Sequence, residues 1–163
     1  MKKSIVSKLA VVCLTAVVAI GGGSAPASAK SKGYVFKYKG VSVTMNGVAK
    51  KLIKKAGKPS KKTVKKSCAY KGKDRTYTYK DFQLKTYSKT NNGAEYVSEI
   101  RFRSNKAVTK EGIRIGSSLK DVTKKYGKAK ARFGVYTFKK GSSKLQIMLN
   151  GNKVSAIRYF ASK

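Results

Sequence analysis

A helix-forming stretch that occurs twice is the feature that most constrains the fold of this chain. In residues 112–127, Ser118 precedes Asp121 by three positions, which is the spacing of a capping box at a helix start. Apolar residues follow at helical spacing, and Gly127 ends the pattern because a residue without Cβ readily adopts the conformations of a helix C-cap. The stretch therefore predicts a short strand, a capped helix and a glycine stop.

Residues 40–57 follow the same plan and are two residues longer inside. The matching apolar positions are Ala49, Leu52 and Ala56 in the first copy and Leu119, Val122 and Tyr126 in the second. We expect Asn46 to cap the helix of the first copy, and Gly57 to end it.

Runs of alternating apolar and polar residues predict strands in most of the remaining chain. These runs are residues 34–38 with 41–43, 74–79, 82–87, 94–103, 135–138, 145–149 and 154–160. Within 94–103, alternation places Tyr96, Ser98, Ile100 and Phe102 on one face. Turn signals such as Asn91-Asn92-Gly93 predict antiparallel neighbours. Residues 60–67 hold four lysines and few apolar residues, and we expect a solvated loop there.

Each copy is thus expected to be a helix followed by about three antiparallel strands. One helix cannot cover such a sheet and also bury its own apolar stripe well, so the two copies should join. The predicted fold class is α+β, with two tandem helix-plus-antiparallel-hairpin repeats that form one curved antiparallel sheet with both helices on one face. Repeat 1 would span residues 30–106 and repeat 2 residues 107–163, together forming a single domain.

The first 29 residues have the three parts of a secretory signal. Lys2, Lys3 and Lys8 supply the basic start, residues 9–20 are apolar, and Ala27-Ser28-Ala29 offers a cleavage site. The apolar run is too short to span a bilayer comfortably, and no second one follows. We expect cleavage after Ala29, no membrane span afterwards, and a product that is secreted and either extracellular or associated with the cell wall.

The formal net charge is +33 at pH 7, and loss of Lys2, Lys3 and Lys8 with the signal would leave +30. That is far above the magnitude of roughly 2–8 that keeps a small domain soluble. Lysine outnumbers arginine 33 to 6, and lysine is a point charge without the planar fork of arginine, so diffuse attraction is favoured over bidentate recognition. The expected partner is an anionic cell-wall polymer or an anionic lipid surface, and sequence-specific binding of nucleic acid is not expected.

Both predicted helices carry lysines beside their apolar stripes, so helices on one side of the sheet would form one basic surface. Such a surface binds polyanions through counter-ion release, with affinity that falls as salt rises. The alternative is a general adaptation in which charge is spread evenly and nothing particular is bound. The lysines expected to bind a polyanion are Lys50, Lys51, Lys54, Lys55, Lys58, Lys61, Lys62, Lys65, Lys66, Lys120, Lys124, Lys125 and Lys128.

The sequence argues against an enzyme. It contains no histidine, which excludes histidine triads and imidazole metal sites. Glu95 and Glu99 could form an acid–base pair, but four residues along a strand separate them by about 13 Å, and we expect them to pair with neighbouring lysines instead. No cofactor and no metal are predicted.

Cys68 is the one cysteine that would remain after cleavage, so an intramolecular disulfide is excluded, while pairing between two chains stays open. Nearby lysines would favour a thiolate, but no second cysteine or partner base completes a reactive site. We expect Cys68 to be a small buried residue of the core. Gly112, Gly116 and Gly127 are expected to be turn and cap residues and not a phosphate-binding loop, because the closing Gly-Lys-Ser/Thr is missing.

Aromatic residues in the middle of the chain have two interpretations. Interleaving with basic residues is typical of platforms that stack on bases or sugars, whereas alternation along strands is typical of a core. The aromatic residues are Tyr77, Tyr79, Phe82 and Tyr87, and the basic ones are Arg75, Lys80 and Lys85. We expect most of the aromatic side chains to be core.

Part of the second copy resembles the beta-lactamase-inhibitor-protein-like architecture. The resemblance lies in residues 112–118, in Asp121-Val122 and Lys125-Tyr126-Gly127, and in the predicted strand hairpin that follows them. That architecture is shared with small outer-membrane lipoproteins of the SmpA/OmlA type. Residues 67–70, followed by 76–79 and Phe82, are also similar to secreted Gram-positive proteins of unknown function. The resemblance implies the fold, and it implies protein binding as a habit of some members. An alternative function is therefore a secreted proteinaceous inhibitor or adaptor that binds another extracellular protein through the sheet face. No inhibitory contact motif is matched.

Overall fold

The computed structural model describes residues 33–162, which form nine strands and two short helices. The elements in chain order are β1 (Val35–Tyr38), β2 (Val41–Thr44), α1 (Lys50–Ala56), β3 (Lys61–Lys66), β4 (Lys73–Thr78), β5 (Phe82–Ser88), β6 (Glu95–Phe102), α2 (Leu119–Tyr126), β7 (Val135–Lys140), β8 (Ser143–Asn150) and β9 (Lys153–Ala161). The fold is α+β with antiparallel strands, as predicted. The predicted secretory signal, residues 1–29, lies outside the described residues.

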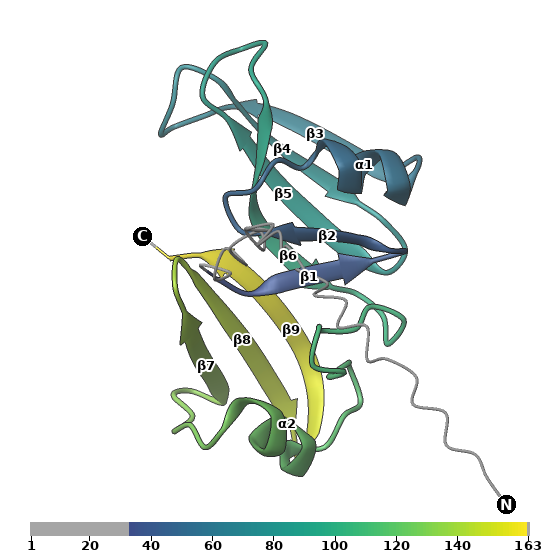
Figure 1. Cartoon of the computed structure of the whole chain (residues 1–163), viewed down its shortest axis with the longest axis vertical. Helices are drawn as coiled ribbons and strands as arrows, with labels where there is room; N and C mark the ends of the chain where they lie inside the picture. The colour runs from purple at the N-terminus through teal and green to yellow at the C-terminus, as the bar shows by residue number, and fades with distance from the viewer. Residues whose placement is uncertain (1–32, 163) are drawn as a thin grey trace, which may run out of the picture.

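Seven strands form one antiparallel sheet in the order β3-β4-β5-β6-β9-β8-β7, and β1 and β2 form a separate hairpin (Figure 1). The centre of the sheet is the pairing of β6 with β9, which spans Glu99 to Arg101 on β6 and Arg158 to Phe160 on β9. Strand β9, the last described strand, therefore lies beside β6, the last strand before α2. The two edges of the sheet are β3 and β7.

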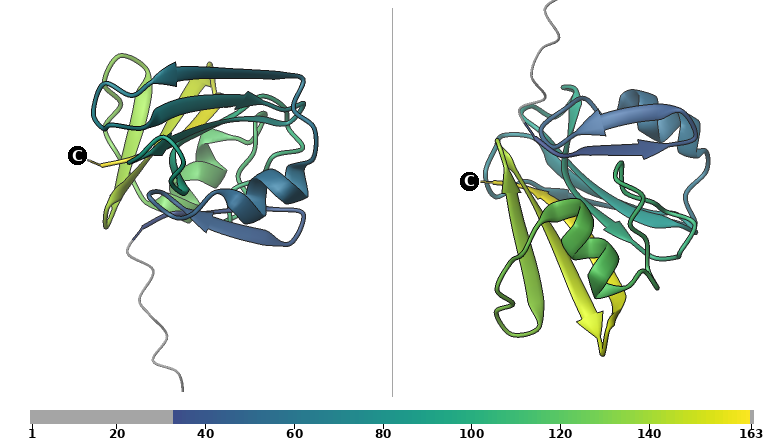
Figure 2. Two further views of the ribbon diagram at one scale, coloured as in Figure 1. Left: turned by 90° about the horizontal axis from the view of Figure 1, so that it is seen from above. Right: turned by 60° about the horizontal axis from the view of Figure 1, so that its bottom comes forward.

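The β1–β2 hairpin and both helices lie against the same face of the sheet, here called the inner face (Figure 2). Helix α1 lies at one end and α2 at the other, with the hairpin between them (Figure 1). Each helix buries one main residue, Leu52 in α1 and Val122 in α2. Phe36 of β1 is fully buried, and the rings of Phe82, Phe102 and Tyr159 lie 5.2–6.4 Å from its ring. The hairpin thus covers the junction of β5, β6 and β9.

Strand β6 contains a bulge that alternation did not predict. Lys85 of β5 lies opposite Glu99, and Thr86 lies opposite Val97, so Ser98 is an extra residue. Because an extra residue reverses the faces of the side chains beyond it, Val97 is fully buried and Tyr96 stands on the outer face beside Tyr87. The prediction that Tyr96 and Ser98 share a face with Ile100 was therefore wrong.

The prediction of a loop over residues 60–67 was also wrong, because residues 61–66 form strand β3. It pairs with β4 from Lys61 opposite Thr78 to Lys66 opposite Lys73, and all six of its side chains are exposed. An edge strand held by hydrogen bonds to one neighbour needs no buried face, so its sequence lacks apolar alternation.

The two helices begin differently. At α2 the predicted capping box is confirmed: the Ser118 hydroxyl accepts from the Asp121 N–H at 3.1 Å, and the Asp121 carboxylate accepts from the Ser118 N–H at 3.2 Å. At α1 the predicted Asn46 cap was wrong, because the N-cap is Ala49 and no side chain caps it. Asn46 instead occupies a turn with φ of 63° and accepts a hydrogen bond from the Tyr87 hydroxyl. Gly57 and Gly127 end the helices as predicted. The short strand predicted at the start of residues 112–127 was wrong, because residues 112–117 belong to none of the described strands.

Candidate functional site

All thirteen lysines predicted to bind a polyanion are exposed, and the structure divides them into two groups. The α1–β3 lysine group comprises Lys50, Lys51, Lys54, Lys55, Lys58, Lys61, Lys62, Lys65 and Lys66. The α2 lysine group comprises Lys120, Lys124, Lys125 and Lys128. The β1–β2 hairpin lies between the two helices (Figure 1), so the outer faces of the helices do not meet directly.

The charge of both lysine groups is uncompensated by carboxylates. Within residues 33–162 the ion pairs are Arg75 with Glu95, and Glu99 with both Lys85 and Arg101. None of the thirteen lysines has a carboxylate within 4.0 Å in that range. Their ammonium groups are therefore available to an external anion.

A groove of about 620 Å³ lies between α1 and the start of β3, and we call it the α1–β3 groove. Its apolar lining includes Val48, Ile53 and Pro59, and Val48 is 52% exposed. Its basic lining is Lys50, Lys54 and Lys62. The Lys62 ammonium lies 5.2 Å from the centre of the Tyr77 ring, close enough for a cation–π contact. The groove thus combines an apolar floor with three cationic groups.

A second hollow of about 420 Å³ lies at the other end of β3. Its lining includes Val64, which is 49% exposed, and four lysines contributed by β3, β4 and the turn between them: Lys65, Lys66, Lys71 and Lys73. Strand β3 is therefore bordered by a basic hollow at each end.

The Glu95 carboxylate lies at the base of the α1–β3 groove and is held by three side chains. Tyr77 donates its hydroxyl hydrogen bond to Glu95 at 2.8 Å, Thr86 donates at 2.8 Å, and the Arg75 Nε lies 3.5 Å away. Burial, followed by this hydrogen bond, raises the pKa of Tyr77 above its usual range. Because its charge is matched by Arg75, Glu95 adds little repulsion toward an anion in the groove.

The two glutamates of β6 do not form an acid–base pair. The bulge at Ser98 places Glu95 with the inner-face residue Thr86, whereas Glu99 lies opposite Lys85. Glu99 pairs with Lys85 at 3.3 Å and with Arg101 at 3.6 Å. The expectation that both glutamates pair with neighbouring lysines is confirmed for Glu99, which pairs with Lys85, and was wrong for Glu95, whose partner is Arg75.

Cys68 is exposed in the turn between β3 and β4, so the prediction that it is a buried core residue was wrong. The preceding Ser67 is buried in its place, and its N–H donates to the Gly72 carbonyl at 3.0 Å. Two small residues stand side by side here, and the more polar serine is the buried one, so hydrophobicity alone predicts the wrong residue to point inward.

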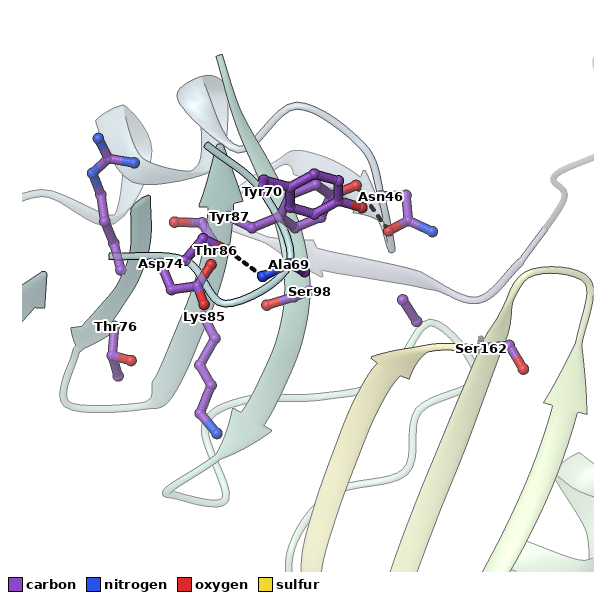
Figure 3. Close-up of a pocket in the computed structure, with 13 residues that line it drawn as sticks. Asn46, Ala69, Tyr70, Asp74, Thr76, Lys85, Thr86, Tyr87, Ser98 and Ser162 are labelled. Carbon is purple, nitrogen blue, oxygen red and sulfur yellow. Dashed lines mark hydrogen bonds between the residues drawn. The ribbon is translucent and has the colours of Figure 1, made fainter. Parts of the chain in front are cut away.

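A hollow of about 540 Å³ on the outer face is lined by the exposed Tyr70 and the half-buried Tyr87 (Figure 3). The Tyr70 ring stacks on the Tyr87 ring with centroids 5.0 Å apart, and Tyr87 lies 5.5 Å from Tyr96. The core interpretation is confirmed for Tyr77, Tyr79 and Phe82, which are buried. Sequence reasoning missed Tyr70 and Tyr96 as neighbours of Tyr87, because the first lies in a turn and the second is displaced by the bulge.

Residues 33–162 hold no group of three His, Cys, Asp or Glu side chains placed to bind a metal ion. In the same range no helix has the length and apolar character needed to cross a membrane. Comparison of the chain with protein-family models, curated proteins and solved structures finds no match.

Proposed function

We propose that this chain is a secreted, non-enzymatic binding protein that associates with anionic polymers of the cell envelope through the α1–β3 lysine group. The observation that carries the proposal is the exposure of nine lysines along one helix, the adjacent edge strand and the turn between them, none of them paired with a carboxylate among the described residues. Such an array releases many counter-ions when it binds a polyanion.

The proposed location follows from the signal-like residues 1–29. Outside the cytoplasmic membrane, the abundant polyanions are teichoic acids and anionic lipid head groups. Lysine ammonium groups suit such partners because they attract phosphate as point charges without requiring a fixed bidentate geometry.

The proposal includes a tandem-repeat origin for the fold, as in the beta-lactamase-inhibitor-protein-like architecture. Equivalent backbone bonds support it. The Ala49 N–H donates to the Glu95 carbonyl, and the Val97 N–H donates to the Gly47 carbonyl. In the second half, the Leu119 N–H donates to the Asn152 carbonyl, and the Val154 N–H donates to the Ser117 carbonyl. Each helix entry is thus attached in the same way to the start of the strand that reaches the sheet centre.

The test is retention of the secreted part of the chain on purified cell walls, with and without teichoic acid, across a salt series. One variant replaces Lys50, Lys51, Lys54 and Lys55 with Gln, and the charge-matched control replaces Lys120, Lys124, Lys125 and Lys128 with Gln. We expect retention to require the polymer and to fall steeply between about 50 and 200 mM salt. The α1 variant should lose several-fold more retention than the α2 control.

Two results would overturn this proposal. Absence of retention at low salt would contradict the proposal that the protein binds an envelope polymer. Equal losses in the two variants would show that net charge alone acts and that the α1–β3 lysine group has no special role.

A second candidate is an inhibitor or adaptor that binds an extracellular protein through the outer sheet face. It is favoured by the exposed Met148, the stacked Tyr70 and Tyr87, and the hollow that Figure 3 shows. A one-to-one complex with a protein that survives high salt and is lost in a Tyr70→Ala variant would select this function over polymer binding.

A further inference from the structure

Strand β3 has a free edge whose unpaired backbone groups can be assigned. Ser67 donates to the Gly72 carbonyl, so residue 67 belongs to the hydrogen-bonded pairs of the β3–β4 ladder. Because such pairs alternate along antiparallel strands, Lys61, Thr63 and Lys65 also direct their N–H and C=O groups toward β4. The backbone groups of Lys62, Val64 and Lys66 therefore point away from the sheet.

The side chains of these three residues project on the inner face. Lys62 lies opposite Tyr77, whose ring is buried in the core, and Val64 and Lys66 share its face because side chains alternate along a strand. The free edge is bordered by the α1–β3 groove at Lys62 and by the second hollow at Val64 and Lys66. The two hollows are separated by about 7–13 Å along the strand, which is two to four residues of extended chain.

Charge selects the kind of chain that this edge can accept. Neither α1 nor β3 contains an acidic residue, and eight of the thirteen residues of the two elements are lysines. A second copy of β3 would be repelled, which protects the edge from self-pairing. An acidic strand would instead meet lysines on both of its faces, because Lys62 and Lys66 lie on the inner face while Lys61 and Lys65 lie on the outer face.

We propose that an extended acidic segment of another protein docks on β3 as an eighth strand, with apolar side chains in the α1–β3 groove and acidic ones against the lysines. Pairing of an extended peptide with an exposed sheet edge gains affinity from backbone hydrogen bonds and specificity from alternate side chains. This inference goes beyond polymer binding, since it requires backbone pairing in addition to charge.

The experiment measures binding of the peptide acetyl-EVEVEVE-amide to the secreted part of the chain, by fluorescence anisotropy of a labelled peptide. The comparison peptide has the same sequence and charge but is N-methylated at every residue, so it cannot donate backbone hydrogen bonds. We expect the unmodified peptide to bind at least tenfold more tightly than the N-methylated one.

A variant of the protein tests whether binding needs the backbone N–H groups of β3. Val64→Pro removes an N–H that points away from β4 and places the ring at the free edge, which an edge strand tolerates. Its circular dichroism and Tm should match the wild type, while affinity for the unmodified peptide falls to that of the N-methylated one. The control Lys120→Gln/Lys124→Gln/Lys125→Gln should retain the difference between the two peptides.

Equal binding of the two peptides by the wild type would overturn the proposal, and so would full affinity in a folded Val64→Pro variant or absence of binding. None of these results bears on polymer binding, which the retention on cell walls tests separately. Val64→Pro should not change that retention. Loss of polymer retention with intact, N–H-dependent peptide binding would reject the proposed function and support the edge site.

Discussion

The carboxylate of Glu95 on β6 links three strands, because its partners Arg75 and Tyr77 lie on β4 and Thr86 lies on β5. Replacing it by Gln would leave Arg75 without its counter-charge and would put a donor where Tyr77 and Thr86 both donate. We expect Glu95→Gln to lower the free energy of unfolding by about 2 kcal/mol, in the range of hydrogen bonds to a charged group. Urea denaturation measures this difference.

Glu99 provides a matched control on the same strand. Its partners Lys85 and Arg101 are 42% and 50% exposed, so water and salt screen the interaction. We expect Glu99→Gln to cost less than about 1 kcal/mol. Equal losses for the two variants would contradict the view that the Glu95 contacts, and not β6 glutamates in general, stabilise the sheet.

Among the helices, α2 has a side-chain cap and α1 has none. Ser118→Ala removes the hydroxyl that bonds the Asp121 N–H, and we expect a loss of about 1 kcal/mol in stability. Native-state hydrogen exchange should show amides of the first α2 turn exchanging roughly fivefold faster, since about 1.4 kcal/mol corresponds to a factor of ten. Amides of α1 should be unchanged, and a matching change in α1 would mean that global unfolding is observed.

The same cap gives a pH dependence with a defined sign. Hydrogen bonds from Ser118 lower the pKa of Asp121, so its contribution to stability is present above the unfolded pKa and is lost as pH falls through the folded value. The stability difference between the wild type and Ser118→Ala should therefore shrink below about pH 4, the range in which an unfolded Asp titrates. A constant difference down to lower pH would show that Asp121 takes no part in the cap.

Elements with a buried face could be predicted from the sequence, and elements held by other forces could not. Strand β5 alternates Phe82, Leu84 and Thr86 toward the core, and its predicted range differs from the observed one by a single residue. Strand β3 has no such alternation, because pairing with β4 is what makes it a strand. The bulge at Ser98 also left no local signal, because it depends on how β5 and β6 are aligned.

The lysines of the candidate site could be predicted from the sequence, but the groove between α1 and β3 could not. Exposure of the thirteen lysines follows from the high cost of burying an unpaired charge. The α1–β3 groove instead brings together Val48, Pro59, Tyr77 and Glu95, which come from four separate parts of the chain. Their proximity depends on the strand order of the sheet, and local residue patterns do not predict that order.

At the scale of the whole molecule, buried tyrosines predict the response to alkali. Burial is the largest cause of the raised pKa of Tyr77, Tyr126 and Tyr159. Because their folded pKa exceeds the unfolded value of about 10, their contribution to stability is complete below pH 10 and is lost as pH rises. We expect phenolate absorbance to show one class of tyrosines that ionises freely and a second that ionises only together with loss of the circular dichroism signal. A single transition near pH 10 with the fold intact would contradict this.

The contact between the first and last strands sets the order in which the molecule can fold. Tyr34 donates its N–H to the Ser143 hydroxyl at 2.7 Å, and the rings of Tyr34 and Phe36 lie 5.9 Å and 6.4 Å from that of Tyr159. The hairpin segment is made before these partners, since Ser143 and Tyr159 belong to β8 and β9. The core therefore cannot be completed until β9 has been made. Contacts so distant in sequence also slow folding, so the chain stays open until its last strand is available. An open chain of this kind is the form that the proposed secretion would require at a narrow translocation channel.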